Sequence, residues 1–285
     1  MDHEQEPRWV TVSITVPAED VDLASGMLWD AGAAGIEERA ADADEDRELR
    51  AGLLAGSVDE VRRALRSDWV IAVEPVAADE GLDAWREFAR PWRAGSRLVI
   101  VPSWIEPPDW CREEDLVLSI DPGRAFGSGS HPTTRMCLAE LEHLVRAGDT
   151  VADIGCGSGL LAIAALCLGA EAAVGVDTEE VAIEVSRANA ERVGVADRST
   201  FLPGTIEVLA GSRFDVVVAN IAAHVLGDIA AALTASVADE GALVLSGVLA
   251  EQSDDLLAEF ERLGFVLLST AAEDDWRALV LRRAN

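Results

Sequence analysis

Two glycine-rich segments lie close together in this 285-residue chain, and both carry residue types that could do chemistry. The first, DPGRAFGSGSHPTT at residues 121–134, contains a single phenylalanine, Phe126, and a single histidine, His131. The second, VADIGCGSG at residues 151–159, runs from an apolar strand pattern into a loop with glycine at every other position. Such glycines let the backbone turn tightly and approach a ligand that a Cβ would push away. The pair of segments predicts a ligand site formed by two polar loops.

An acidic residue follows the second segment at a spacing typical of nucleoside binding. Asp177 ends the segment AAVGVD, 22 residues after Gly155. Ligands of open α/β sheets bind outside the carboxyl ends of the strands, where this carboxylate could accept both ribose hydroxyls of an adenosine. The dinucleotide fingerprint is G-x-G-x-x-G. The spacing here is G-x-G-x-G with Asp153 two residues ahead, which argues against a nicotinamide dinucleotide.

The segments around these loops alternate between strand and helix patterns. The predicted strands are 150–154, 172–177, 199–202, 214–220, 241–247, 265–270 and 276–283. Several of them are continuous apolar runs, as expected where helices cover both faces of a parallel sheet. The last two have no helix between them and predict an antiparallel hairpin. We therefore expect a doubly wound, Rossmann-like α/β domain over residues 114–285.

The chain before this domain has a different pattern. WVTVSITV at residues 9–16 alternates with period two, and the order β-α-β-β-α-β over residues 1–76 predicts a ferredoxin-like α+β domain. Residues 77–113 are expected to form a linker. Five of the eight tryptophans lie between Trp69 and Trp110, where they could pack this linker against its neighbours or form a contact surface.

Composition narrows the class of protein. The chain is 49% hydrophobic and 26% charged, which favours a packed core over disorder. Its start is acidic and polar, unlike a secretory signal, and the most apolar stretch, from Leu160, is too short to span a bilayer. The four cysteines lack metal-binding spacing. We expect a cytoplasmic protein with reduced thiols, no metal site and no membrane partner.

Charge is the unusual feature of the composition. The net charge is −29, and all 23 Lys/Arg positions are arginine. Such a surface repels phosphate, so direct nucleic-acid binding is not expected, whereas a basic protein substrate would be attracted. An acidic or salt-adapted proteome in the host explains the same charge equally well.

Four segments together resemble one family. The glycine pattern is similar to motif I of S-adenosylmethionine-dependent methyltransferases, and with residues 121–134, VGVD at 174–177 and VVVANI at 216–221 it resembles the PrmA family. These are methyltransferases of large-subunit ribosomal protein eleven. The likeness extends over nearly the whole chain. Ser128 stands where the family usually has threonine, which leaves substrate preference open.

The resemblance implies the cofactor, the substrate and the roles of individual residues. The cofactor is S-adenosylmethionine, and the substrate is a basic ribosomal protein methylated at lysine side chains and its N-terminal α-amine. Asn220 would orient the nucleophilic nitrogen, Phe126 would shield the sulfonium or anchor its loop, and His131 would order the loop or accept a proton. The residues expected to contact the cofactor are Thr134, Asp153, Gly155, Gly157, Gly159, Asp177 and Asn220.

The resemblance also implies separate roles for the two domains, and three alternative functions stay open. The N-terminal domain would recognise the substrate, residues 77–113 would act as a hinge, and we expect a monomer. One alternative is a lysine methyltransferase of the same scaffold that acts on another protein. A second is a nicotinamide-dependent oxidoreductase, and a third is an acidic assembly protein with a degenerate pocket.

Overall fold

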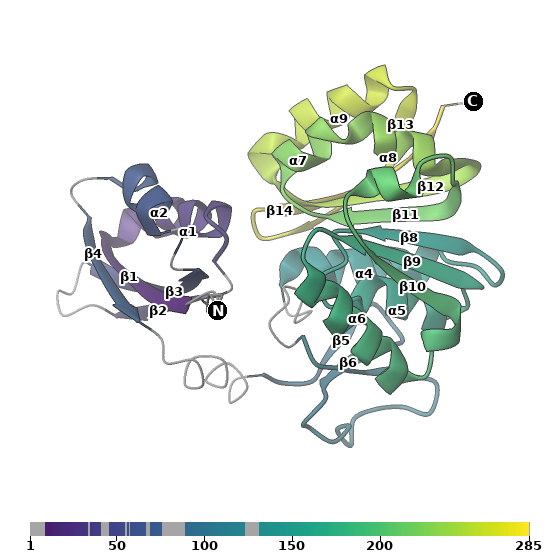
Figure 1. Ribbon diagram of the computed structural model, residues 1–285, viewed down its shortest axis with the longest axis horizontal. Helices are drawn as coiled ribbons and strands as arrows, with labels where there is room; N and C mark the ends of the chain where they lie inside the picture. Colours follow the sequence, from purple (N-terminus) through teal and green to yellow (C-terminus); the bar gives the residue numbers. More distant parts are fainter. Residues whose placement is uncertain are drawn as a thin grey trace, which may run out of the picture. The chain divides into compact units, whose positions relative to one another are not determined.

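The computed structural model describes residues 9–33, 35–40, 46–54, 56, 58–66, 69–75, 89–122 and 131–284. The chain divides into two compact units, Met1–Ala89 and Arg90–Asn285 (Figure 1). In the described residues, no helix is both long enough and apolar enough to cross a membrane.

The described residues of unit 1 form an antiparallel sheet and two α-helices. Its elements are β1 (Trp9–Pro17), α1 (Val21–Asp30), β2 (Ile36–Ala40), β3 (Asp46–Leu54), α2 (Val58–Ala64) and β4 (Val70–Pro75). The sheet order is β2-β3-β1-β4, which is the split βαβ arrangement of ferredoxin-like folds. Alternate residues of β1, among them Val12 and Ile14, are fully buried beside Leu28 of α1. Period two therefore places one face of the sheet in the core.

The segment expected to be a linker is partly strand. β5 (Trp92–Ala94) and β6 (Leu98–Pro102) pair with each other, and β6 runs parallel to β7 (Leu116–Ile120) in a three-stranded sheet. Residues 90–113 thus belong to unit 2, because Leu98 and Ile100 of β6 are buried in the same core as the helices α4 (Pro132–Leu144) and α5 (Leu160–Leu168). Residues 76–88 lie outside the described residues.

The tryptophans of this region do not behave alike. Trp69 is buried in the core of unit 1 and Trp92 is half-buried. Trp104 and Trp110 are 36% and 47% exposed. Trp85 lies outside the described residues. Packing and exposure therefore both occur among them.

Unit 2 is built on a seven-stranded sheet. Its strands are β8 (Thr150–Ile154), β9 (Ala172–Asp177), β10 (Ser199–Pro203), β11 (Phe214–Asn220), β12 (Val237–Leu249), β13 (Phe265–Glu273) and β14 (Trp276–Arg283). Their order is β10-β9-β8-β11-β12-β14-β13, with β8 to β12 parallel and β14 antiparallel to both of its neighbours. The predicted doubly wound domain and its terminal hairpin are confirmed. Strand order reverses between β8 and β11, which is where α/β sheets bind ligands.

Helices cover both faces of this sheet (Figure 1). One face carries α4 (Pro132–Leu144), α5 (Leu160–Leu168) and α6 (Glu180–Val193), and the other α7 (Ala223–Asp228), α8 (Ala230–Ser236) and α9 (Ser253–Arg262). Alternate residues of β11 enter the two cores: Val216 and Val218 pack with the first group of helices, Val217 and Ala219 with the second. The continuous apolar run of the sequence is explained by this double coverage.

Candidate functional site

The glycine loop leaves the carboxyl end of β8 in a conformation that L side chains rarely adopt. Gly155, Gly157 and Gly159 have φ of 73°, 52° and 76°. A Cβ on Gly159 would lie 2.9 Å from Cβ of Ser186 and 3.1 Å from the ring of Phe201. Close approach and positive φ together require glycine here.

Asp177 locks this loop to the end of β9. Its Oδ2 accepts the amide hydrogen of Gly157 at 2.8 Å and its Oδ1 that of Glu179 at 3.0 Å. The amides of Gly155 and Cys156 both donate to the carbonyl of Val176, at 2.8 and 3.0 Å. Each carboxylate oxygen keeps a second lone pair, so the Asp177 carboxylate can still accept two ribose hydroxyls.

Asp153 lies beneath the loop and is 1% exposed. Its Oδ2 accepts the amide hydrogen of Ala162 at 3.1 Å, while its Oδ1 has no hydrogen-bond partner among the described residues. Burial raises the pKa of Asp153 to about 7, and the nearby charge of Asp177 adds to the shift. A hydrogen-bond donor on a bound ligand would satisfy this unpaired, buried acceptor beneath the glycine loop.

Asn189 joins the two glycine-rich segments, and sequence reasoning missed it. From the fully buried inner face of α6, its Nδ2 donates to the carbonyls of Asp121 and Ser158, both at 2.9 Å. Its Oδ1 accepts the amide hydrogen of Asp121, also at 2.9 Å. The signal available was a polar residue on the apolar face of a predicted amphipathic helix, since a buried amide needs partners.

A second group of residues lies where β11 meets the first turn of α4. Asn220 ends β11, and its Nδ2 donates to Oγ1 of the buried Thr134 at 3.2 Å. His131 is the N-cap of α4: its Nδ1 accepts the amide hydrogen of Thr133 at 3.4 Å and lies 2.8 Å from that residue's Oγ1. Burial, aided by the charge of Arg135, lowers the pKa of His131. His131 thus caps α4, while its predicted role, ordering the loop or accepting a proton, stays a prediction because residues 123–130 lie outside the described residues.

The glycine loop lies next to the residues at which β11 meets the first turn of α4. A Cβ on Gly155 would collide with Cγ2 of Ile221, the residue after Asn220. The structure thus brings the glycine loop and Asp177 next to Asn220 and Thr134, at the switch in strand order. Phe126, the remaining predicted site residue, lies outside the described residues.

The C-terminal hairpin also reaches this site, again unforeseen from sequence. The rings of Trp276 and His131 meet edge to face, with centroids 5.0 Å apart and planes at 72°. Glu273 forms an ion pair with Arg135 of α4. Ser246 of β12 donates to the carbonyl of Thr133 at 3.4 Å. The first turn of α4 is therefore held by three strands from the end of the chain.

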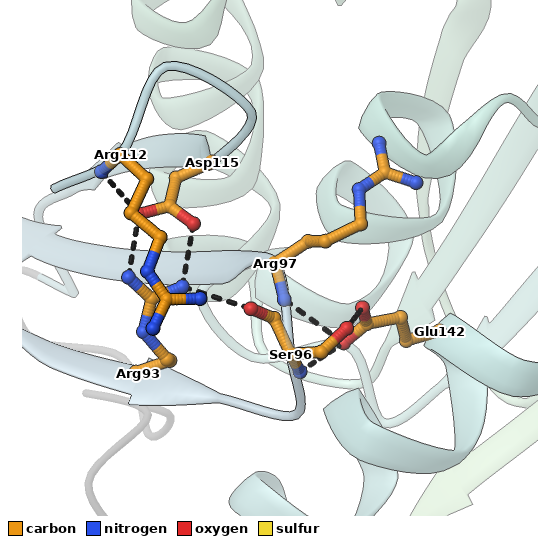
Figure 2. A network of polar contacts seen from close by, with 6 residues as sticks. All are labelled: Arg93, Ser96, Arg97, Arg112, Asp115 and Glu142. Carbon is orange, nitrogen blue, oxygen red and sulfur yellow. Dashed lines mark hydrogen bonds and ion pairs between the residues drawn. The ribbon is translucent and has the colours of Figure 1, made fainter.

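The other end of α4 is tied to the small sheet. Backbone amides of Ser96 and Arg97 donate to the Glu142 carboxylate at 2.7 and 3.4 Å (Figure 2). Arg93 binds both oxygens of Asp115 at 2.5 Å, which lowers the pKa of Asp115 to about 2. These contacts fix β5, β6 and the start of β7 against α4, and β7 leads directly into the first glycine-rich segment.

Metal-ligating clusters do not occur in the described part of the chain. No group of three or more His, Cys, Asp or Glu side chains there could hold an ion. All four cysteines are free thiols, and burial raises the pKa of Cys137 to about 12.

Comparison with known proteins points to one family. The model of the ribosomal protein L11 methyltransferase family (PrmA) matches residues 51–284. A ribosomal protein L11 methyltransferase of Pelotomaculum thermopropionicum is 34% identical over 306 residues, covering 96% of this chain and 98% of the relative. One of Thiobacillus denitrificans is 41% identical over 270 residues, covering 95% and 86%. The crystal structure of a ribosomal protein L11 methylase from Lactobacillus delbrueckii subsp. bulgaricus is 26% identical, with a TM-score of 0.64, and covers 70% of this chain and 100% of that one.

Proposed function

This chain belongs to the ribosomal protein L11 methyltransferase family, PrmA, and from that premise we propose that it methylates amino groups of a large-subunit ribosomal protein with S-adenosylmethionine. The observation that carries the proposal is the juxtaposition of the glycine loop and Asp177 with Asn220 at one edge of the sheet. The proposed acceptors are lysine side chains and the N-terminal α-amine.

The described residues fit an adenosine cofactor. Bound S-adenosylmethionine supplies an electrophilic methyl group on a sulfonium. Asp177 would accept the ribose hydroxyls, and the loop from Gly155 to Gly159 gives the backbone close access to the ligand. Asp153 Oδ1 offers a buried acceptor below the loop. Thr134 and Asn220 would bound the site on the side of the acceptor amine.

Positioning supplies most of the catalysis in an in-line displacement. The nucleophile must be a neutral amine. At neutral pH deprotonation costs roughly 4–5 kcal/mol for a lysine and about 1 kcal/mol for an α-amine. Desolvation in the site lowers the pKa of a lysine, whereas an adjacent carboxylate would raise it. A neutral amide at position 220 avoids that penalty.

The orientation of the Asn220 amide follows from its partner. Because Nδ2 donates to Thr134, the amide oxygen is the end that it can offer to an amine hydrogen. Asn220 would thus align the lone pair of the amine nitrogen by accepting a hydrogen bond from one of the amine hydrogens. No residue is proposed as a dedicated base, and water would take the proton that methylation releases.

The remaining parts of the proposal concern the partner. Unit 1 would recognise the protein substrate, and the net charge of −29 favours a basic one. The part of the predicted hinge, residues 77–113, that precedes unit 2 would let one catalytic unit serve several amines. We propose that the enzyme acts as a monomer in the cytoplasm.

An intact-mass assay tests the function. The chain is incubated with S-adenosylmethionine and unmethylated large-subunit ribosomal proteins, with Asp177→Ala as the matched control. Successive methyl increments on protein L11 alone, absent with the variant, support the proposal. Methyl increments on another protein support methyl transfer by this chain but identify a different substrate. Cofactor binding without any increment overturns ribosomal-protein methylation.

A further inference from the structure

The first turn of α4 depends on one imidazole nitrogen. His131 caps the helix through Nδ1, which faces both the amide hydrogen and the hydroxyl of Thr133. A nitrogen that accepts an amide hydrogen carries no proton, so the hydrogen bonds assign the neutral ring with its proton on Nε2. The next residue, Thr134, carries the hydroxyl that accepts from Asn220. The cap and the acceptor side of the site therefore share one helical turn.

Protonation of His131 would remove this cap. A protonated Nδ1 is a donor and cannot accept from Thr133, and a cation at a helix N-terminus opposes the helix dipole. Burial of the ring adds to the cost of charge there, since water is excluded. The neutral state is the one that orders the turn.

Two opposite charges lie beside this ring. Arg135 follows His131 on α4, and Glu273 comes from the tip of the C-terminal hairpin; the two form an ion pair. The Arg135 charge lowers the pKa of His131 and the Glu273 charge raises it. The same hairpin carries Asp274, Asp275 and Arg277, and Arg277 donates to the carbonyls of Asp274 and Trp276.

We propose that His131 is a positioning residue whose neutral ring orders the acceptor side of the site, and that the Arg135–Glu273 ion pair sets the pH below which this order is lost. The hairpin is thereby assigned a part in the reaction: it delivers Glu273 and Trp276 to the start of α4. Protonation of the acceptor amine already gives an acid limb in the pH profile of methyl transfer. Folded-state protonation of His131 then adds a second limb at lower pH, the His131 limb.

The ion pair offers a test that separates electrostatics from structure. Glu273→Gln and Arg135→Gln break the same contact with the same kind of side chain. Loss of the Glu273 charge lowers the pKa of His131, so the His131 limb of kcat/KM moves to lower pH. Loss of the Arg135 charge raises that pKa, so the His131 limb moves to higher pH. A purely structural contact predicts displacement in the same direction, or none, for both variants.

The proton itself is followed by NMR. The imidazole signal of His131 is titrated in the wild type and both variants, assigned by its absence in His131→Asn, with the exposed His143 and His224 as internal references. Opposite displacements for the two variants support the proposal. Equal displacements, or none, overturn it.

Replacement of the cap itself gives a second, kinetic readout. Asparagine caps helices well and does not titrate over this range, whereas alanine does not cap. Both His131→Asn and His131→Ala should lose the His131 limb and keep only the limb set by the acceptor amine, and only the alanine variant should lose the order of the turn, seen as faster amide hydrogen exchange at Thr134. A second, low-pH limb that persists in His131→Asn overturns the assignment.

The kinetic arms rest on the proposed methyl transfer, whereas the NMR and exchange arms do not. If no substrate is methylated, the titration of His131 still decides this inference. The two failures are therefore distinguishable.

Discussion

The cofactor side and the acceptor side of the site are built in different ways. The cofactor side comes from residues 151–177, which are continuous in sequence. Its loop is held by backbone amides that donate to the carbonyl of Val176 and to the carboxylate of Asp177. The acceptor side is assembled from side chains of α4, β11, β12 and the C-terminal hairpin, with up to 138 residues between partners. A short local motif can therefore specify cofactor binding, while the acceptor geometry depends on the completed fold.

The largest expected effect is on the cofactor side. Asp177→Ala removes the acceptor of two amide hydrogens and of the ribose hydroxyls. Two hydrogen bonds to a charged group, at about 1.5–3 kcal/mol each, imply S-adenosylmethionine binding weaker by at least about 100-fold. Calorimetric titration measures this. Asp177→Asn keeps one acceptor oxygen, so its Kd should lie between those of the wild type and the alanine variant. An unchanged Kd in the alanine variant would mean that the site lies elsewhere.

Substitution of Asn220 should affect the reaction step most. Loss of one preorganised polar group typically costs about 100-fold in kcat, which is the decrease expected for Asn220→Ala. Asn220→Asp places a carboxylate beside the amine and raises its pKa, so its activity should fall at neutral pH and recover as pH rises. The pH dependence of kcat compares the two. An Asn220→Asp variant with wild-type activity at neutral pH contradicts the role given to the neutral amide.

Asn189 connects the two glycine-rich segments, so its loss should loosen both. Asn189→Ala removes the Nδ2 donor to the carbonyls of Asp121 and Ser158. We expect the free energy of unfolding to fall by about 2–4 kcal/mol. Arg192→Met is the control: Arg192 is exposed and binds the same Oδ1 at 2.6 Å, but its removal leaves the Asn189 donor in place. Its change should stay within about 0.5 kcal/mol. If urea unfolding shows the same loss of stability in both variants, the hydrogen bonds that Asn189 Nδ2 donates are unimportant for stability.

The smallest effect is expected at the hairpin. Trp276→Leu removes the edge-to-face partner of His131, a contact worth about 0.5–1.5 kcal/mol. The expected loss in kcat/KM is up to about tenfold, with the Kd of S-adenosylmethionine retained. Trp104→Leu, at an exposed tryptophan of the segment after β6, is the matched control and should change neither kcat/KM nor the Kd of S-adenosylmethionine. A weakened Kd in Trp276→Leu would contradict the separation of the two sides.

What the sequence could predict follows the same division. Apolar runs such as 214–220 and the alternation of 9–16 identify strands, because their partners cover whole faces and leave a local pattern. The spacing of the glycines and Asp177 likewise lies within one βαβ unit. Glu273 and Trp276 carry no such signal, since their partners are distant in sequence and meet only in the folded chain. Asn189 stands out only as a polar residue on the apolar face of a helix, and its partners cannot be read from that position. Within the predicted linker, residues 77–113, β5 and β6 leave little local pattern because both are short. β5 pairs only with β6, and β6 pairs with β7 after an intervening loop.

The most direct test of the central claim is a calorimetric titration of the wild-type chain with S-adenosylmethionine and, separately, with a nicotinamide dinucleotide. The glycine spacing and the carboxylate at the end of β9 predict saturable binding of S-adenosylmethionine and none of the dinucleotide. Binding of the dinucleotide alone, or of neither ligand, would contradict the assignment of this site to methyl transfer.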